Sequence, residues 1–270
     1  MDEFYVERHE ASAAVSALDR TIEAAAISAS NSTALLDYSA LATLVVTPNG
    51  GPIRTIITGR RRITTGSYAS IKAGRSLPFE SMNERAFLMH SEVDASVVDY
   101  RAQPFRLELV IEGTKRAYIP DGLRLLDTGT LEVIEIKKDR RSHADPDYAI
   151  KLEYVAKICE LVGWHFRTIY ATELFQPTQR YRNILDVQSW RLTDYSDSDL
   201  YQIAARLDAA KAETFGVLSE LLGGCPSANA KLKAMMVNRV LRIDLDSPLS
   251  CSSLVQRVQE PRIDQMDELQ

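Results

Sequence analysis

The sequence predicts an α/β fold followed by a C-terminal helical module. Between residues 81 and 171 the pattern runs helix, three strands, helix and strand, whereas strand signals fade after Pro177. With 270 residues, 45% of them hydrophobic and 26% charged, the chain is long enough for two domains and can bury a substantial core. We therefore predict an N-terminal arm over 1–37, an α/β domain over 38–177 and a helical module over 178–270.

The segment before the α/β unit predicts a hairpin and a loop. Residues 11–36 carry only a weak helical pattern. Two β-rich runs, 41–47 and 53–58, flank Asn49-Gly50, which is typical of a tight hairpin turn. The polar segment 60–75 then predicts a long basic loop.

Periodicity and capping residues define the elements of the α/β unit. A helix is expected over 81–90. Strands are expected in the runs 107–111, 116–126, 131–138 and 164–171. A second helix should begin at Asp145-Pro146, because aspartate caps helices and proline suits the first turn, and it should stop at Gly163.

The C-terminal module has helical patterns throughout. They cover 180–190, a long amphipathic run over 198–222, the run 228–241 and a last short helix through Val258. Helices followed by a short β-like element resemble a small winged-helix module, although that order is common.

Composition limits the class of protein. The net charge is -5, from 32 basic and 37 acidic residues, which argues against a uniformly basic nucleic-acid coat protein. The average conceals residues 38–79, which hold six basic and no acidic residues. Three scattered cysteines favour reduced thiols in a cytoplasmic protein, and the sequence shows neither a secretion signal nor an apolar run that could span a membrane.

The most informative group is Pro120-Asp121 followed by Glu135 and Lys137. Glu135 and Lys137 are two apart on one strand, so their side chains share a face, and Asp121 joins them if the two strands pair. Carboxylates suit Mg²⁺, which activates water and offsets phosphate charge, and a lysine can stabilise the developing negative charge. This pattern indicates phosphodiester hydrolysis. The alternative is a strand edge with solvated charges.

Glu84 has two interpretations. It could add a third carboxylate to the group, because its helix precedes the sheet. However, Ser81-Met-Asn-Glu84 also matches the capping box, in which the glutamate bonds back to the start of its own helix. Spacing alone favours the capping role.

Together with its flanks, this group resembles the PD-(D/E)xK nuclease superfamily, and within it the TnsA-type endonuclease subunit of heteromeric transposases. The resemblance covers about residues 60 to 190 and continues more weakly over 239–249. The matching stretches are Phe79–Glu84, Val98–Pro104, Tyr118–Asp121, Glu135–Lys137, and Tyr170–Glu173 with Arg182-Asn183. The resemblance implies a restriction-endonuclease-like mixed sheet flanked by helices, with a winged-helix-like module after it.

The resemblance also implies a role for each matching side chain. Asp121 and Glu135 would bind metal, Glu84 would complete the acidic cluster, and Lys137 would assist the attacking water. Mg²⁺ is the implied cofactor, with Mn²⁺ as a substitute. Some relatives carry glutamine at the position of Glu135, and glutamate is the commoner choice. Gln103-Pro104 also matches, and there we expect only a structural turn before a strand.

Basic residues around this group are candidates for DNA phosphate contact, since lysine and arginine release counterions from DNA. They are Arg60, Arg61, Arg62, Lys72 and Arg75 in the basic stretch, and Lys138, Arg140 and Arg141 just after the carboxylates. The alternative is an ordinary solvated loop.

The resemblance implies a Mg²⁺-dependent DNA endonuclease that hydrolyses one strand at transposon ends. It would act beside a DDE-type transposase, which cuts and joins the other strand, and an ATPase regulator. One alternative is a catalytically silent DNA-binding or assembly subunit with the same fold. Another is a stand-alone restriction or repair nuclease, against which the extra C-terminal module and the family-like flanks speak.

Overall fold

The structure is a computed structural model that describes residues 42–47, 51–53, 64–139 and 145–258, together with Leu18 and Arg141. The chain forms two compact units, Met1–Leu88 with Asp99–Leu174, and Met89–Val98 with Phe175–Gln270. In the described ranges, no helix is both long and apolar enough to cross a bilayer. The predicted arm lies outside the described residues, apart from Leu18, which is helical and buried.

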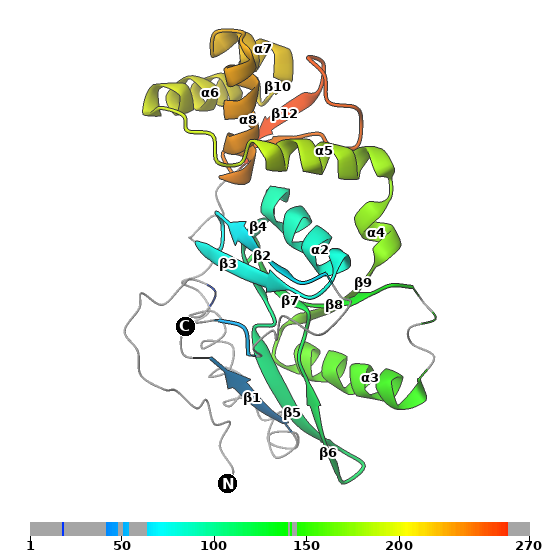
Figure 1. The fold of residues 1–270 in the computed structure, drawn as a ribbon. Helices are drawn as coiled ribbons and strands as arrows, with labels where there is room; N and C mark the ends of the chain where they lie inside the picture. The colour runs from blue at the N-terminus through cyan, green and yellow to red at the C-terminus, as the bar shows by residue number, and fades with distance from the viewer. Residues whose placement is uncertain are drawn as a thin grey trace, which may run out of the picture. The chain divides into compact units, whose positions relative to one another are not determined.

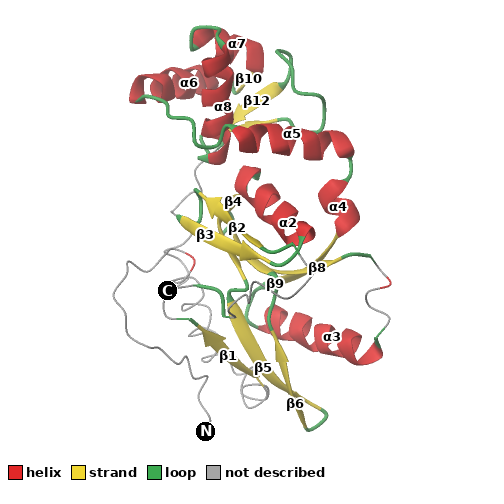
Figure 2. Cartoon of the chain, in the orientation of Figure 1, coloured by secondary structure: helices red, strands yellow, loops and turns green. Residues whose placement is uncertain are grey.

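Strands β1 to β9 form three sheets, shown as arrows in Figures 1 and 2. The largest has the order β4-β7-β8-β9 and consists of β4 (Val97–Ala102), β7 (Gly122–Leu126), β8 (Leu131–Lys137) and β9 (His165–Tyr170). The second has the order β1-β5-β6 and consists of β1 (Ala42–Val46), β5 (Phe105–Ile111) and β6 (Thr114–Tyr118). The third pairs β2 (Gly66–Ser70) with β3 (Arg75–Phe79). Because β8 is antiparallel to β7 and parallel to β9, the largest sheet is mixed.

Helices α2 (Met82–Val93) and α3 (Pro146–Leu161) cover opposite faces of this sheet. α2 packs closely on β7, because a Cβ atom at Gly122 would lie 2.4 Å from Cε1 of Phe87. α3 lies on the face that carries Glu135, which its Tyr148 contacts. α3 starts as predicted, with Asp145 as its N-cap, and Gly163 follows its end at a φ of +73°. A mixed α/β architecture is therefore confirmed.

The predicted strand over 116–126 is wrong, because two strands occupy it. β6 ends at Tyr118 in one sheet and β7 begins at Gly122 in another. Pro120 has no N–H group and cannot continue a ladder of hydrogen bonds, so the chain breaks there and crosses between sheets. Asp121 therefore lies at the crossing, directly before β7, rather than inside a strand.

The predicted basic loop over 60–75 is also wrong in its described part. Residues from Gly66 onward form the hairpin of β2 and β3, in which Tyr68 pairs with Leu77. Alternate residues of β3 are buried, which the polar composition concealed. The predicted hairpin around Asn49-Gly50 lies mostly outside the described residues, and the described strand β1 pairs with β5.

The second unit is largely helical, with one small antiparallel sheet. Its elements follow the short helix α4 (Ala171–Phe175) and are α5 (Thr178–Ser189), α6 (Asp197–Ala210), β10 (Ala212–Thr214), α7 (Phe215–Leu221), α8 (Pro226–Val237), β11 (Leu241–Ile243) and β12 (Leu254–Arg257). The sheet order is β10-β12-β11, and both pairings are antiparallel.

Two predictions for this unit are corrected. The single helix expected over 198–222 is interrupted, because Lys211 adopts a φ of +61° and ends α6, and Thr214 then caps α7. The last helix expected through Val258 is strand β12, which is only four residues long and buries only Val255, too weak a pattern to be recognised in the sequence.

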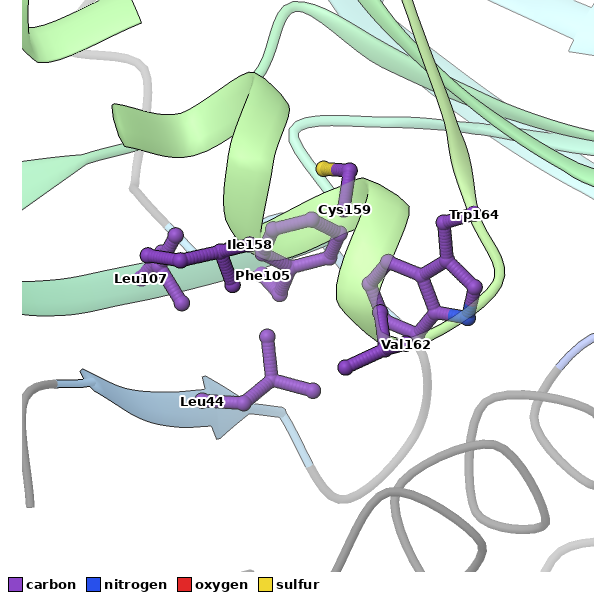
Figure 3. Close-up of a pocket in the computed structure, with 7 residues that line it drawn as sticks. All are labelled: Leu44, Phe105, Leu107, Ile158, Cys159, Val162 and Trp164. Carbon is purple, nitrogen blue, oxygen red and sulfur yellow. The ribbon is translucent and has the colours of Figure 1, made fainter. Parts of the chain in front are cut away.

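The core of the first unit contains a small apolar cavity between α3 and strands β1 and β5 (Figure 3). Its lining residues are Leu44, Phe105, Leu107, Ile158, Cys159, Val162 and Trp164. The volume is about 20 Å³, which accommodates about one water-sized molecule, and an apolar lining of this kind stays dry. The cavity is therefore a packing gap rather than a binding site.

Candidate active site

Asp121, Glu135 and Lys137 come together at the point where the chain crosses between the two larger sheets. Gly122 pairs with Ile134 across β7 and β8, so Asp121 lies opposite Glu135, on the same face. Oδ2 of Asp121 accepts the Ile136 N–H at 2.6 Å, which fixes its carboxylate against β8. The convergence predicted from strand pairing and spacing is therefore confirmed.

Glu135 is almost fully buried, with 3% of its surface exposed, and three polar groups contact it. Its Oε1 lies 2.5 Å from Nζ of Lys137 and accepts the Tyr148 hydroxyl at 2.5 Å. Its Oε2 accepts the Tyr118 hydroxyl at 2.8 Å. Nζ of Lys137 also donates to the Tyr148 oxygen at 3.0 Å. Glu135, Lys137 and Tyr148 thus form a closed triangle of contacts.

Burial and like charge alter proton affinity across this group. Burial, followed by repulsion from Glu135, raises the pKa of Asp121 from 3.8 to about 8 against the opposing hydrogen bond from Ile136. Burial and the neighbouring Glu135 also raise the pKa of Tyr118 and of Tyr148, so both hydroxyls remain donors. Perturbed carboxylates of this kind are typical of functional sites.

Lys151, one turn after Tyr148 on α3, places a second ammonium group beside Tyr148, in addition to that of Lys137. Its Nζ lies 4.6 Å from the centre of the Tyr148 ring, and Lys137 lies 4.2 Å from the same ring. Burial lowers the pKa of Lys151, partly against the attraction of Glu135. The tyrosine ring is therefore contacted by two ammonium groups.

Glu84 makes the contacts expected of a helix cap. Its Oε2 accepts the Glu80 N–H at 2.8 Å, its Oε1 accepts the Ser81 hydroxyl at 3.0 Å, and the Glu84 N–H donates to Ser81 at 3.1 Å. It is nevertheless near enough to Asp121 to raise the pKa of that residue by charge repulsion. Glu84 thus lies beside the site with its carboxylate engaged in capping.

Asp121 and Glu135 fit a magnesium ion through their chemistry. Two carboxylates at one strand crossing supply hard oxygen ligands, and the repulsion between them is what a divalent cation would relieve. In the described ranges no group of three His, Cys, Asp or Glu side chains is gathered as a metal site. Mg²⁺ commonly takes only one or two protein carboxylates and keeps several waters, so a two-carboxylate site remains suitable.

The basic residues predicted to contact DNA divide into two groups. Arg60, Arg61, Arg62 and Arg140 lie outside the described residues. Lys72 lies in the turn between β2 and β3, Arg75 is the first residue of β3, and exposed Lys138 and Arg141 follow β8.

Sequence reasoning assigned no role to two members of the site, Tyr118 and Tyr148. Tyr118 was recognised only as part of the stretch before Asp121, and Tyr148 had no signal beyond its place in the first turn of α3. Gln103, for which a structural turn was expected, is in one: it lies between β4 and β5 at a φ of +47°, and its N–H donates to the Asp121 carbonyl at 3.2 Å.

On the opposite face of the sheet a separate ion pair is buried. Nη2 of Arg124 lies 2.6 Å from Oε2 of Glu132, and both side chains are less than a tenth exposed. Arg124 also lies over the Phe87 ring, 5.4 Å from its centre. This pair ties β7 to β8 beneath the carboxylates.

Part of the chain matches a known family of proteins. Residues 94–171 match the family described as TnsA-like endonuclease N terminal. The match includes Asp121, Glu135 and Lys137 and extends from just before β4 to the end of β9, whereas Glu84 precedes it. Among curated proteins, none matches this chain. The resemblance to a TnsA-type endonuclease expected from the sequence is therefore confirmed over this segment.

Proposed function

We propose that this protein, with its TnsA-like endonuclease domain, is the subunit of a heteromeric transposase that hydrolyses one DNA strand at each transposon end. The observation that carries the proposal is the convergence of Asp121, the buried Glu135 and its ion-pair partner Lys137 on one face of paired strands, inside the segment that matches the family. A group of opposite charges held in this arrangement suits phosphodiester hydrolysis.

Each side chain has a task in that reaction. Asp121 and Glu135 would hold Mg²⁺, with Mn²⁺ as a substitute, and Glu84 could complete the acidic cluster by leaving its cap. The bound ion supplies a water of lowered pKa and charge compensation for the phosphate. Lys137 orients the water and stabilises negative charge on the phosphate oxygens. The surrounding strands and tyrosines keep bulk water away from Glu135.

Basic side chains near the crossing would hold the DNA backbone. We propose that Lys72, Arg75, Lys138 and Arg141 contact phosphates, together with Arg60, Arg61, Arg62 and Arg140 of the remaining basic stretches. Contacts of this kind weaken steeply with salt, since they depend on counterion release.

The order of elements after α5 supports a winged-helix-like module. It runs α6, β10, α7, α8, β11, β12, with a three-stranded antiparallel sheet. α8, in the place of a recognition helix, is mostly buried, and its Lys231 and Lys233 are each paired with an aspartate at 2.8 Å. The loop between β11 and β12 carries Asp244 and Asp246 and no basic residue. Because both lysines of α8 are paired with aspartates and the β11–β12 loop is acidic, we propose that the module contacts transposase or ATPase partners more than DNA.

A second candidate is a catalytically silent assembly subunit in the same complex. The observation in its favour is that Glu84 is engaged as a cap and Glu135 is already contacted by three polar groups. Three free cysteines support action in the cytoplasm for either candidate.

Strand cleavage tests the first candidate. A transposon-end duplex labelled on the strand that the transposase does not cut would be incubated with the protein, its DDE-type transposase partner and Mg²⁺. We expect Asp121→Ala and Glu135→Ala to abolish the nick, whereas Glu160→Ala, which removes an exposed carboxylate at the end of α3, should leave it unchanged. Full cleavage by the first two variants would refute this active site and favour the silent subunit.

A further inference from the structure

The geometry points to Tyr148 as a positioning residue that holds Glu135 and Lys137 in their working orientations. This inference rests on the proposed function and extends it to a residue on α3. Its hydroxyl is the only group among the described residues that is hydrogen-bonded to both side chains, donating to Glu135 at 2.5 Å and accepting from Lys137 at 3.0 Å.

The position of the hydroxyl is fixed by the helix that carries it. Tyr148 is in the first turn of α3, which Asp145 caps by accepting the Asp147 N–H. Further along, Leu152 and Val155 are buried and anchor the helix in the core. The hydroxyl therefore reaches Glu135 from a rigid support, as precise sites require.

The ring of Tyr148 is held as firmly as its hydroxyl. Lys137 lies 4.2 Å and Lys151 4.6 Å from its centre, distances at which an ammonium group is attracted to an aromatic face. Replacing tyrosine by phenylalanine would keep these two contacts and remove only the hydroxyl.

The hydroxyl determines which oxygen of Glu135 stays available. Oε1 is contacted by Tyr148 and Lys137, which use its two acceptor positions. Oε2 accepts one hydrogen bond within the described part of the chain, from Tyr118, so an acceptor position remains there. By turning Oε1 away, Tyr148 presents Oε2 as the oxygen that can bind a cation.

Hydrogen bonds from a neighbouring side chain to a metal ligand affect both the affinity for the metal and the catalytic rate. Removing the partner of a metal-binding carboxylate typically costs about 10-fold to 100-fold in metal affinity or activity. A positioning role therefore predicts weaker metal binding and a lower kcat, with KM for DNA unchanged, because Tyr148 holds the reacting groups rather than the bulk of the duplex.

The test is calorimetry with Mn²⁺ on the full chain, followed by cleavage kinetics. Four proteins are compared: the wild type, Asp121→Ala, Tyr148→Phe, and Tyr154→Phe as a matched loss of a hydroxyl from the same helix. We expect Tyr148→Phe to raise the Kd for Mn²⁺ by about 10-fold at unchanged stoichiometry and to lower kcat by about 10-fold or more. Tyr154→Phe should match the wild type.

Each other result has a distinct meaning. Unchanged or tighter Mn²⁺ binding by Tyr148→Phe would overturn the positioning role. A fall in stoichiometry at an unchanged Kd would overturn it too, because the molecules that are folded would then bind Mn²⁺ as tightly as the wild type. If the wild type binds no Mn²⁺, or Asp121→Ala binds it equally well, the proposed function itself fails. Loss of binding in Asp121→Ala with a normal Tyr148→Phe would leave the function in place and reject this inference alone.

Discussion

Replacing Asp121 by asparagine should stabilise the metal-free protein while removing its activity. Burial and the nearby Glu135 raise the pKa of Asp121 to about 8, compared with 3.8 for an ordinary aspartate. At pH 7 the folded chain must therefore keep a proton that the unfolded chain has released. Each pH unit between 3.8 and 7 corresponds to about 1.4 kcal/mol. The cost of Asp121 to the free energy of unfolding at pH 7 is therefore at most about 4 kcal/mol.

Asparagine avoids this cost because it is neutral, and its carbonyl oxygen can still accept the Ile136 N–H. Since Asp121 keeps some contact with solvent, we expect a gain of roughly 2–4 kcal/mol in the free energy of unfolding at pH 7.

The pH dependence of this gain is diagnostic. Between pH 4 and pH 8 the folded wild type binds more protons than the unfolded chain, so its stability falls as pH rises through this window. Asp121→Asn lacks that dependence, and its advantage should grow from near zero at pH 4 to a maximum near pH 8. Urea unfolding in the presence of a chelator, at pH 5 and pH 8, measures it. A variant that is less stable than the wild type, or a difference independent of pH, would refute the reasoning.

Three further predictions concern the fold around the site. Glu132→Ala leaves Arg124 buried without its partner and should cost about 3–5 kcal/mol in urea unfolding, whereas a loss below about 1 kcal/mol would mean that water replaces the pair. Gly122→Ala should place a Cβ atom against the buried Phe87 ring, reduce the free energy of unfolding by about 1–3 kcal/mol and lower Tm by several degrees. An unchanged melting curve would contradict this packing. Burial raises the pKa of Cys159 to about 12, so alkylation followed by mass spectrometry should modify the two exposed cysteines first, and equal rates for all three would show that α3 opens readily.

The convergence of Asp121, Glu135 and Lys137 was predictable because it follows from strand pairing and short-range spacing. Two residues on one strand at spacing two must share a face, and paired neighbouring strands bring Asp121 opposite Glu135. Helix α3 was equally predictable, since Asp145 marks its start and Gly163 follows its end.

Tertiary contacts account for what the sequence did not reveal. Tyr148 joins the site because α3 packs on the face of the sheet that carries Glu135, and no spacing encodes that packing. The break at Pro120 was hidden because apolar residues continue on both sides of it, although the chain changes sheets there. Similarly, α6 ends at Lys211 because this residue adopts a positive φ, a conformation that the sequence usually indicates by a glycine rather than a lysine.

The measurement that tests the central claim most directly is strand cleavage by Asp121→Asn. With the proposed transposase partner, Mg²⁺ and a transposon-end duplex labelled on the strand that the transposase does not cut, the wild type should nick the labelled strand. The folded and more stable variant should give no nick above background, because it lacks the charge that holds the ion. Cleavage by Asp121→Asn at the wild-type rate would contradict the assignment of this carboxylate to catalysis.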